Sequence, residues 1–163
     1  MPLPLRFQWL ALPAMMLAVF PWRAELALPP EDATLVQHLL FPLVHASLLH
    51  WAVNMLSWMF LWRLVTLPRL CTAYAASVII GYVYSVPRGF PAWIPSLCPS
   101  LPLCGFSVVV FFFLGLVYFR LPRRSRLSML ALVAVSFFVP HVAASAHLMA
   151  LVLGMAYARA IVL

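Results

Sequence analysis

The chain has 163 residues, of which 66% are hydrophobic and only 8% are charged, whereas about 25% of the residues of a soluble domain are charged. This composition excludes a soluble domain and indicates a bilayer protein with room for at most about six or seven helices of 20 residues each. The formal net charge is +7, but the arginines are scattered between apolar runs, which is typical of loop anchors and not of a nucleic-acid-binding surface.

Charge-free runs and prolines divide the chain into expected membrane helices. The run over 7–22 predicts a first helix, and no small-residue cleavage site follows it to mark a signal peptide. Pro42 interrupts the next run, which predicts a partly embedded loop followed by a second helix. Four prolines within 88–102 predict a loop, and Pro140 divides the last long run into two helices. We therefore expect an all-α membrane protein, a single domain over residues 1–163, with six transmembrane helices at about 5–22, 44–63, 69–86, 105–120, 125–139 and 142–160.

The positions of the arginines predict how these helices are oriented. With the N-terminus in the cytoplasm, only Arg23 and Arg88 of the ten basic residues fall on the outer side, together with all three acidic residues. This distribution follows the positive-inside rule. We expect a multi-pass integral membrane protein with both termini in the cytoplasm, and a bacterial inner membrane as its location.

The absence of acidic residues after Asp32 limits the chemistry that this membrane protein can perform. It excludes an intramembrane aspartyl protease, a zinc protease of the H-E-x-x-H type and a Ser-His-Asp triad. Histidine, serine, asparagine and cysteine remain at membrane depth, where polar side chains indicate functional sites. The sequence predicts no metal and no cofactor.

Three polar residues are expected at one depth in the membrane. His50, Ser107 and His147 lie 12 or 13 residues before the arginine that ends their respective helices. At 1.5 Å per residue, all three sit about 18–20 Å from the cytoplasmic boundary, and Asn54 lies one turn below His50 on the same helix face. The helix over 105–120 is only about 22 Å long, so it is expected to start inside a hydrocarbon core about 30 Å thick.

This arrangement predicts acyl-transfer chemistry centred on a serine. Ser107 stands at a helix N-terminus, where free N–H groups and the helix dipole favour developing negative charge. His147 is the candidate general base for the Ser107 nucleophile, and the lack of an acid predicts a dyad. The Ser107 backbone N–H, the His50 ring and the Asn54 amide are the candidate donors to a tetrahedral oxyanion.

The same residues form motifs that resemble the rhomboid family of intramembrane serine proteases. The family pattern H-x-x-x-N in helix two is matched at 50–54, the G-x-S pattern that opens helix four at 105–107, and the A-H pattern of helix six at 146–147, followed by Gly154. The resemblance covers nearly the whole chain, and its motifs occur in order on the expected helices. It implies a six-helix rhomboid-like bundle.

The resemblance also implies the roles of the site residues and the kind of substrate. It assigns Ser107 as the nucleophile, His147 as the base, and His50 with Asn54 as parts of the oxyanion site. Rhomboids cleave the helical membrane anchors of other proteins near the outer face, without a metal or cofactor. The expected partners are therefore transmembrane protein substrates and the lipid bilayer, with no nucleic acid, and the active site is expected to open to the outer side.

Some positions support this resemblance and others depart from it. Gly105 and His45 would have supporting roles beside the catalytic residues. Val108 replaces the glycine that usually follows the serine, Phe111 stands where a tyrosine often packs on the base, and Ala150 replaces a glycine after the histidine. None of these departures removes a reacting group.

Two other functions stay open from the sequence. One is a catalytically inactive rhomboid-like protein that binds membrane helices. The other is a haem-binding helical bundle in which His50 and His147 face each other across two helices.

Overall fold

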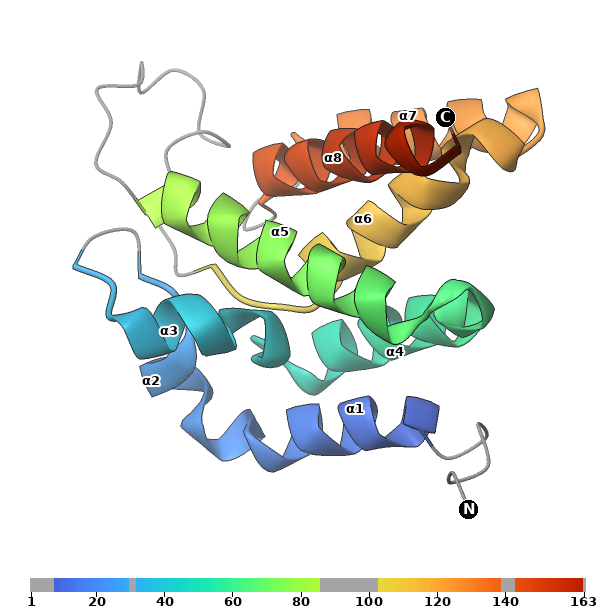
Figure 1. The fold of residues 1–163 in the computed structure, drawn as a ribbon. Coiled ribbons are helices and arrows are strands. Elements are labelled where there is room, and N and C mark those ends of the chain that lie inside the picture. Colours follow the sequence, from blue (N-terminus) through green and yellow to red (C-terminus); the bar gives the residue numbers. More distant parts are fainter. Residues whose placement is uncertain (1–7, 30–31, 86–102, 139–142, 163) are drawn as a thin grey trace.

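The chain folds into a bundle of α-helices (Figure 1), seen in a computed structural model that describes residues 8–29, 32–85, 103–138 and 143–162. The longer helices of the described residues are α1 (Gln8–Ala18), α4 (Leu48–Leu61), α5 (Leu67–Ser85), α6 (Ser107–Val117), α7 (Arg123–Ser136) and α8 (Ala144–Val162). Shorter elements connect them: η1 (Phe20–Trp22), α2 (Arg23–Leu26), α3 (Leu35–Leu40), η2 (Phe41–Leu43), η3 (Trp62–Leu64) and η4 (Tyr118–Arg120). Within the described ranges, extended pairing is limited to an isolated bridge between Leu28 and Leu103.

This architecture confirms the all-α prediction. The segment before Pro42, for which the sequence predicts a loop, instead contains the helix α3, capped by Thr34. The helix starts differ from the predicted ones by two to four residues, and the local structure explains two of these differences. α4 begins at Leu48, four residues after the predicted position 44, because Ser47 caps it by accepting a hydrogen bond of 3.1 Å from the His50 N–H. α6 begins at Ser107, because Gly105 has a φ of 111° that cannot belong to an α-helix. The predicted proline-rich loop at 88–102, Pro102 included, and the predicted break at Pro140 lie outside the described residues.

Length and composition single out few of these helices as membrane spans. In the part of the chain that the structure describes, the segment Ala144–Ile161 is long and apolar enough to cross a bilayer. The pair Leu35–Leu43 and Leu48–Leu64 passes the same test only if the two helices, bent by 69°, count as one span. Leu67–Val83 and Ser107–Arg120 are apolar but shorter. The number of six spans therefore stays a prediction.

α6 occupies the centre of the bundle, where it packs against α4, α5 and α8 (Figure 1). Its sequence is apolar around the whole helix, and residues from Val108 to Phe113 are mostly buried. A helix without a polar face is stable only when its whole surface avoids water. The central place of α6 therefore follows from its composition, and it leaves Ser107, the first residue of the helix, half-buried.

Two glycines bring α6 and α8 into close contact. A Cβ atom added to Gly154 would lie 2.1 Å from the carbonyl oxygen of Phe112, and one added to Gly115 would lie 2.3 Å from the carbonyl oxygen of Leu151. Both obstacles are backbone atoms, which cannot move aside. Glycine is therefore required on both sides of this crossing, as in the small-residue contacts that bring helix backbones together in membranes.

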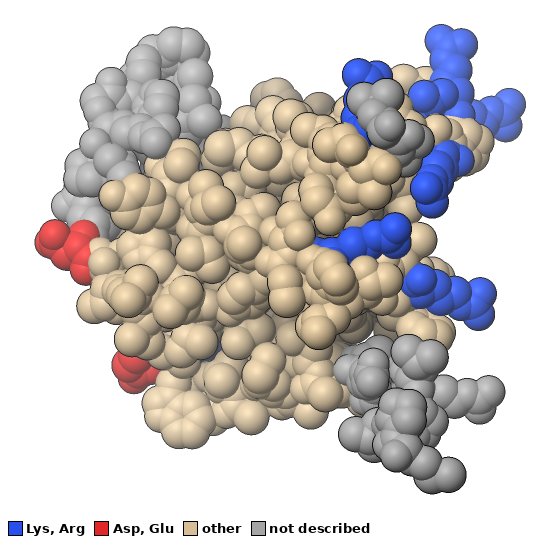
Figure 2. Space-filling model, viewed as in Figure 1, with Lys and Arg blue, Asp and Glu red and all other residues tan. Residues whose placement is uncertain are grey.

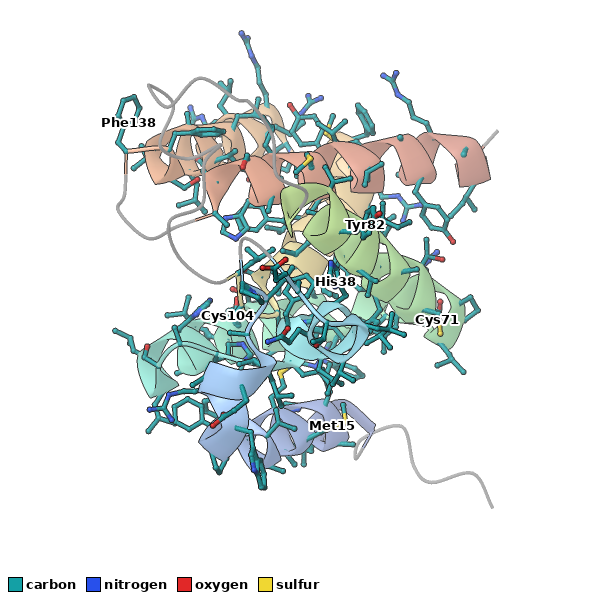
Figure 3. All side chains as sticks on the ribbon, turned by 90° about the vertical axis from the view of Figure 1, so that its left-hand side faces the viewer. Met15, His38, Cys71, Tyr82, Cys104 and Phe138 are labelled. Carbon is teal, nitrogen blue, oxygen red and sulfur yellow. The ribbon has the colours of Figure 1, made fainter. Side chains whose placement is uncertain are left out.

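The outside of the bundle carries large apolar side chains. Leu49, Phe60 and Phe138 are 75%, 78% and 86% exposed, and Figure 3 shows Phe138 projecting away from the helices. Soluble monomers rarely expose such extensive apolar surface. This surface suits a hydrocarbon environment.

Charge is separated between the two ends of the bundle (Figure 2). The described acids, Glu25 and Asp32, lie at one end, and most arginines gather at the other, where α4, α6 and α8 end and α5 and α7 begin (Figures 1 and 2). This separation of arginines from acidic residues agrees with the uneven charge distribution that the sequence predicts for the two sides of the membrane. Which end faces the cytoplasm stays a prediction.

Candidate active site

The turn that leads into α6 requires glycine at position 105. The φ of 111° lies in a region that side chains other than glycine rarely adopt. A Cβ atom there would also lie 2.5 Å from Cε1 of His50. The Gly105 N–H donates to the carbonyl oxygen of Phe41 at 3.2 Å. The supporting role expected for Gly105 thus has two physical reasons, its backbone conformation and the space taken by His50.

Phe106 anchors the same turn in the core. Its side chain is fully buried and meets the ring of Trp58 edge-on, with centroids 5.2 Å apart. Trp58 follows His50 and Asn54 at intervals of four residues, so all three lie on one face of α4. The Phe106 N–H donates to Nε2 of His45 at 3.4 Å. These contacts place the start of α6 against the face of α4 that carries the predicted site residues.

Ser107 and His147 meet across the interface of α6 and α8. The Ser107 Oγ and the His147 Nε2 are 2.8 Å apart and form a hydrogen bond. When Nε2 is the unprotonated ring nitrogen, it accepts from the serine hydroxyl. The structure therefore brings together two side chains that are 40 residues apart in the sequence.

Packing, in place of a carboxylate, orients the His147 ring. Phe111, one turn after Ser107, stacks on it with ring centroids 4.4 Å apart and planes 13° from parallel. The Nδ1 atom of His147 is buried and has no hydrogen-bond partner among the described residues. Phe111 thus contacts the histidine from the position where a tyrosine was expected.

His50 and Asn54 line the wall opposite the turn. The Cβ position of Gly105 is 2.7 Å from Nε2 of His50 and 3.6 Å from Nδ2 of Asn54. Asn54 is 4% exposed, and its Nδ2 has no hydrogen-bond partner in the described part of the chain. A buried amide without a partner is costly, so its place beside the turn that precedes Ser107 suits a donor kept free for a bound group.

His45 has a different place from the other histidines. It is 1% exposed, lies before α4, and meets the His50 ring edge-on with centroids 5.2 Å apart. Since its Nε2 accepts the Phe106 N–H, His45 holds the turn and the His50 ring in place. This geometry fits the supporting role expected from the sequence.

Some residues that shape the site were not singled out by sequence reasoning. Trp58 of α4 packs on the Phe106 ring at the start of α6, and its only signal in the sequence is the four-residue spacing from Asn54. Gly115 packs against Gly154, but a single glycine in an apolar run does not reveal its partner.

The described residues contain no group of three or more His, Cys, Asp or Glu side chains that could hold a metal ion. The side chains that do gather are therefore a hydroxyl, imidazoles and an amide. This set fits acyl transfer by a serine nucleophile, an imidazole base and neutral hydrogen-bond donors.

Comparison with protein families identifies the domain. The family model described as Rhomboid domain matches residues 32–163, a range that includes every residue of the site. No curated protein matches the chain significantly. Since the match covers well over half of the sequence, the chain belongs to the rhomboid family and is an integral membrane protein.

Proposed function

We propose that this protein is an intramembrane serine endopeptidase that hydrolyses peptide bonds in or near the transmembrane segments of membrane-anchored proteins. The observation that supports this proposal best is the 2.8 Å hydrogen bond between Ser107 and His147 at the first turn of α6. Membership of the family of intramembrane proteases supports it independently.

The first half of the reaction acylates the serine. The Ser107 Oγ attacks the carbonyl carbon of the scissile peptide bond while Nε2 of His147 takes the hydroxyl proton. His147 then gives this proton to the leaving amine as the C–N bond breaks. The product is an ester between Ser107 and the amino-terminal part of the substrate.

The negative charge of the tetrahedral intermediate needs donors placed in advance. The Ser107 N–H belongs to the first turn of α6 and is not used within the helix. The Asn54 Nδ2 has no partner among the described residues, and the His50 Nε2 lies on the same wall. One such donor contributes about 10²–10³-fold in kcat in serine proteases.

The second half of the reaction releases the acyl group. A water molecule attacks the ester carbonyl while His147 takes its proton, and the proton then returns to the Ser107 oxygen as the ester bond breaks. Both side chains recover their starting states. Each step uses only groups that this chain supplies, plus water.

The inactive alternative keeps the same fold but predicts binding without cleavage. In such a protein, the contact between Ser107 and His147 would have no chemical purpose, and a buried Asn54 donor would stay unpaired without benefit. The haem alternative needs one ring nitrogen of His147 as an iron ligand, and the Nδ1 atom is buried, which leaves Nε2. That atom already bonds Ser107, which favours the hydrolase.

A reporter cleavage assay tests the proposal. A single-pass membrane reporter with small residues near the outer end of its anchor is co-expressed with the wild type, Ser107→Ala, His147→Ala, or Ser57→Ala as a control at a half-buried serine of α4. We expect cleavage by the wild type and the control and none by the other two. Cleavage that survives both site substitutions contradicts the mechanism, and a folded wild type that binds the reporter without cleaving it supports the inactive alternative.

A further inference from the structure

A cavity lies at the arginine-rich end of the bundle, away from the serine. It has a volume of about 430 Å³ and is lined by residues from the start of α5, the end of α6 with η4, and the end of α8. Leu116 in its wall is nine residues from Ser107, which is about 14 Å along α6. The cavity is therefore distinct from the candidate active site.

Three arginines surround this cavity, Arg69, Arg120 and Arg159. The Arg69 Nη1 donates to the carbonyl oxygen of Leu64 at 3.0 Å, and the Arg159 guanidinium lies 4.5 Å from the centre of the Phe119 ring. These contacts restrain both side chains but leave most of their five N–H donors without a partner among the described residues. Restrained guanidinium groups suit a phosphate, which they can bind with paired hydrogen bonds.

Protein side chains do not neutralise this charge in the part of the chain that the structure describes. The described acids, Glu25 and Asp32, lie at the opposite end of the bundle (Figure 2). Three positive charges thus line one apolar cavity. Arg120 and Arg159 are exposed, so water weakens their repulsion, and a bound anion would lower it further.

The rest of the cavity wall is apolar. Leu64, Leu116, Val117 and Ile161 line it, and Ile161 is 52% exposed. The cavity thus continues into the apolar outer surface of the bundle. A free phosphate ion gains nothing from such a wall, whereas a phospholipid presents a phosphate and a hydrocarbon chain together.

We propose that this cavity binds one anionic phospholipid, with its phosphate on Arg69, Arg120 and Arg159 and the first part of an acyl chain along Leu116 and Val117. Basic pockets between membrane helices are a recurrent way of recognising acidic headgroups. The proposal concerns binding alone and does not depend on the peptidase activity.

Native mass spectrometry of the full chain in detergent tests this site. The protein is titrated with phosphatidylglycerol or phosphatidylcholine of identical acyl chains, with and without inorganic phosphate. Four proteins are compared: the wild type, Arg69→Gln/Arg159→Gln, Val117→Trp, and Arg123→Gln/Arg124→Gln. The last double variant removes the same charge from exposed positions of α7 outside the cavity.

We expect the wild type and the α7 variant to retain one phosphatidylglycerol in preference to phosphatidylcholine, and inorganic phosphate not to displace it. Arg69→Gln/Arg159→Gln should bind phosphatidylglycerol at least about tenfold more weakly, because each charged hydrogen bond contributes about that factor. Val117→Trp keeps every charge but fills the cavity, so it should weaken binding similarly. If Arg69→Gln/Arg159→Gln does not fold, the binding of phosphatidylglycerol by Val117→Trp still tests the site.

Any of four results would overturn the proposal. Equal retention of both lipids by the wild type would show that the headgroup charge is not recognised. An equal loss in the α7 variant would show a general effect of net charge. Displacement by inorganic phosphate, or unchanged binding by Val117→Trp, would show an anion site without a place for an acyl chain.

Discussion

At the scale of single residues, the site depends on how His147 is held without a carboxylate. A carboxylate fixes both the tautomer and the direction of the imidazole in a triad. Here the Nδ1 atom has no partner among the described residues, and the stacked Phe111 ring limits rotation about the side chain. Phe111 is therefore a positioning residue in the proposed mechanism.

Removing this ring should slow catalysis without weakening substrate binding. We expect Phe111→Leu to lower kcat by about tenfold and to leave KM nearly unchanged, because a mobile imidazole spends less time in the productive geometry. Phe111→Tyr should keep most of the activity, since its ring can stack in the same way. The measurement is steady-state cleavage of a membrane reporter, with Phe138→Leu at an exposed position as the control. A tyrosine variant as slow as the leucine variant would argue against positioning by stacking.

A substitution of Asn54 should change catalytic activity and folding stability in different directions. Because its Nδ2 is buried without a partner, Asn54→Ala removes an unsatisfied donor, and we expect the free energy of unfolding to stay the same or rise slightly. If Asn54 donates to the oxyanion, kcat should fall by about 10²–10³-fold in the same variant. Thermal unfolding in detergent and reporter cleavage measure the two quantities. A variant that loses stability and activity together would indicate a structural role instead.

At the scale of helices, the crossing of α6 and α8 sets the distance between the two reacting groups. Ser107 lies eight residues before Gly115, and His147 lies seven residues before Gly154. The two side chains are thus about 12 Å and 10.5 Å from the crossing, which accounts for their meeting at one level.

A methyl group at this crossing should separate the helices. We expect Gly154→Ala to lower the free energy of unfolding by about 1–3 kcal/mol, as overpacking does in other cores, because the new Cβ would lie 2.1 Å from a backbone oxygen. Activity should fall as well, since the hydrogen bond between Ser107 and His147 would lengthen. Ala156→Leu, at an exposed position of the same helix, is the control and should change stability by less than about 0.5 kcal/mol. Unchanged stability of Gly154→Ala would mean that the helices are not packed this closely.

The element scale also shows what the sequence can predict. The longer helices followed mainly from charge-free runs, whereas α2 and α3 did not. The common level of Ser107 and His147 followed from their nearly equal distances to the terminal arginines, because helices have a fixed rise per residue. The late start of α4 depends on the Ser47 cap. The packing of Gly115 on Gly154 and the hydrogen bond from Phe106 to His45 join distant segments, and no local pattern in the sequence encodes such contacts.

At the scale of the whole molecule, the separation of charge predicts an orientation in the membrane. The energetic preference for arginine on the cytoplasmic side would place the Arg124 end inside and the Glu25 end, nearer the site, outside. A substrate anchor would then be cut near the outer surface.

Cysteine accessibility in intact bacterial cells tests this orientation. In a chain with its native cysteines replaced by serine, we expect Glu25→Cys to react with a membrane-impermeant maleimide from outside the cell. Arg124→Cys should react only after the membrane is permeabilised. The reverse pattern would show that the arginine-rich end faces outward.

The central claim is that His147 activates Ser107 as a nucleophile, and labelling by a fluorophosphonate measures this most directly. Purified wild-type protein should become labelled at Ser107, as located by mass spectrometry of the peptide that contains it. His147→Ala should label about 10²–10⁴-fold more slowly, because it lacks the general base, and Ser107→Ala should not label. A folded wild type that does not react, or a reaction at Ser107 that proceeds equally fast without His147, would contradict the account.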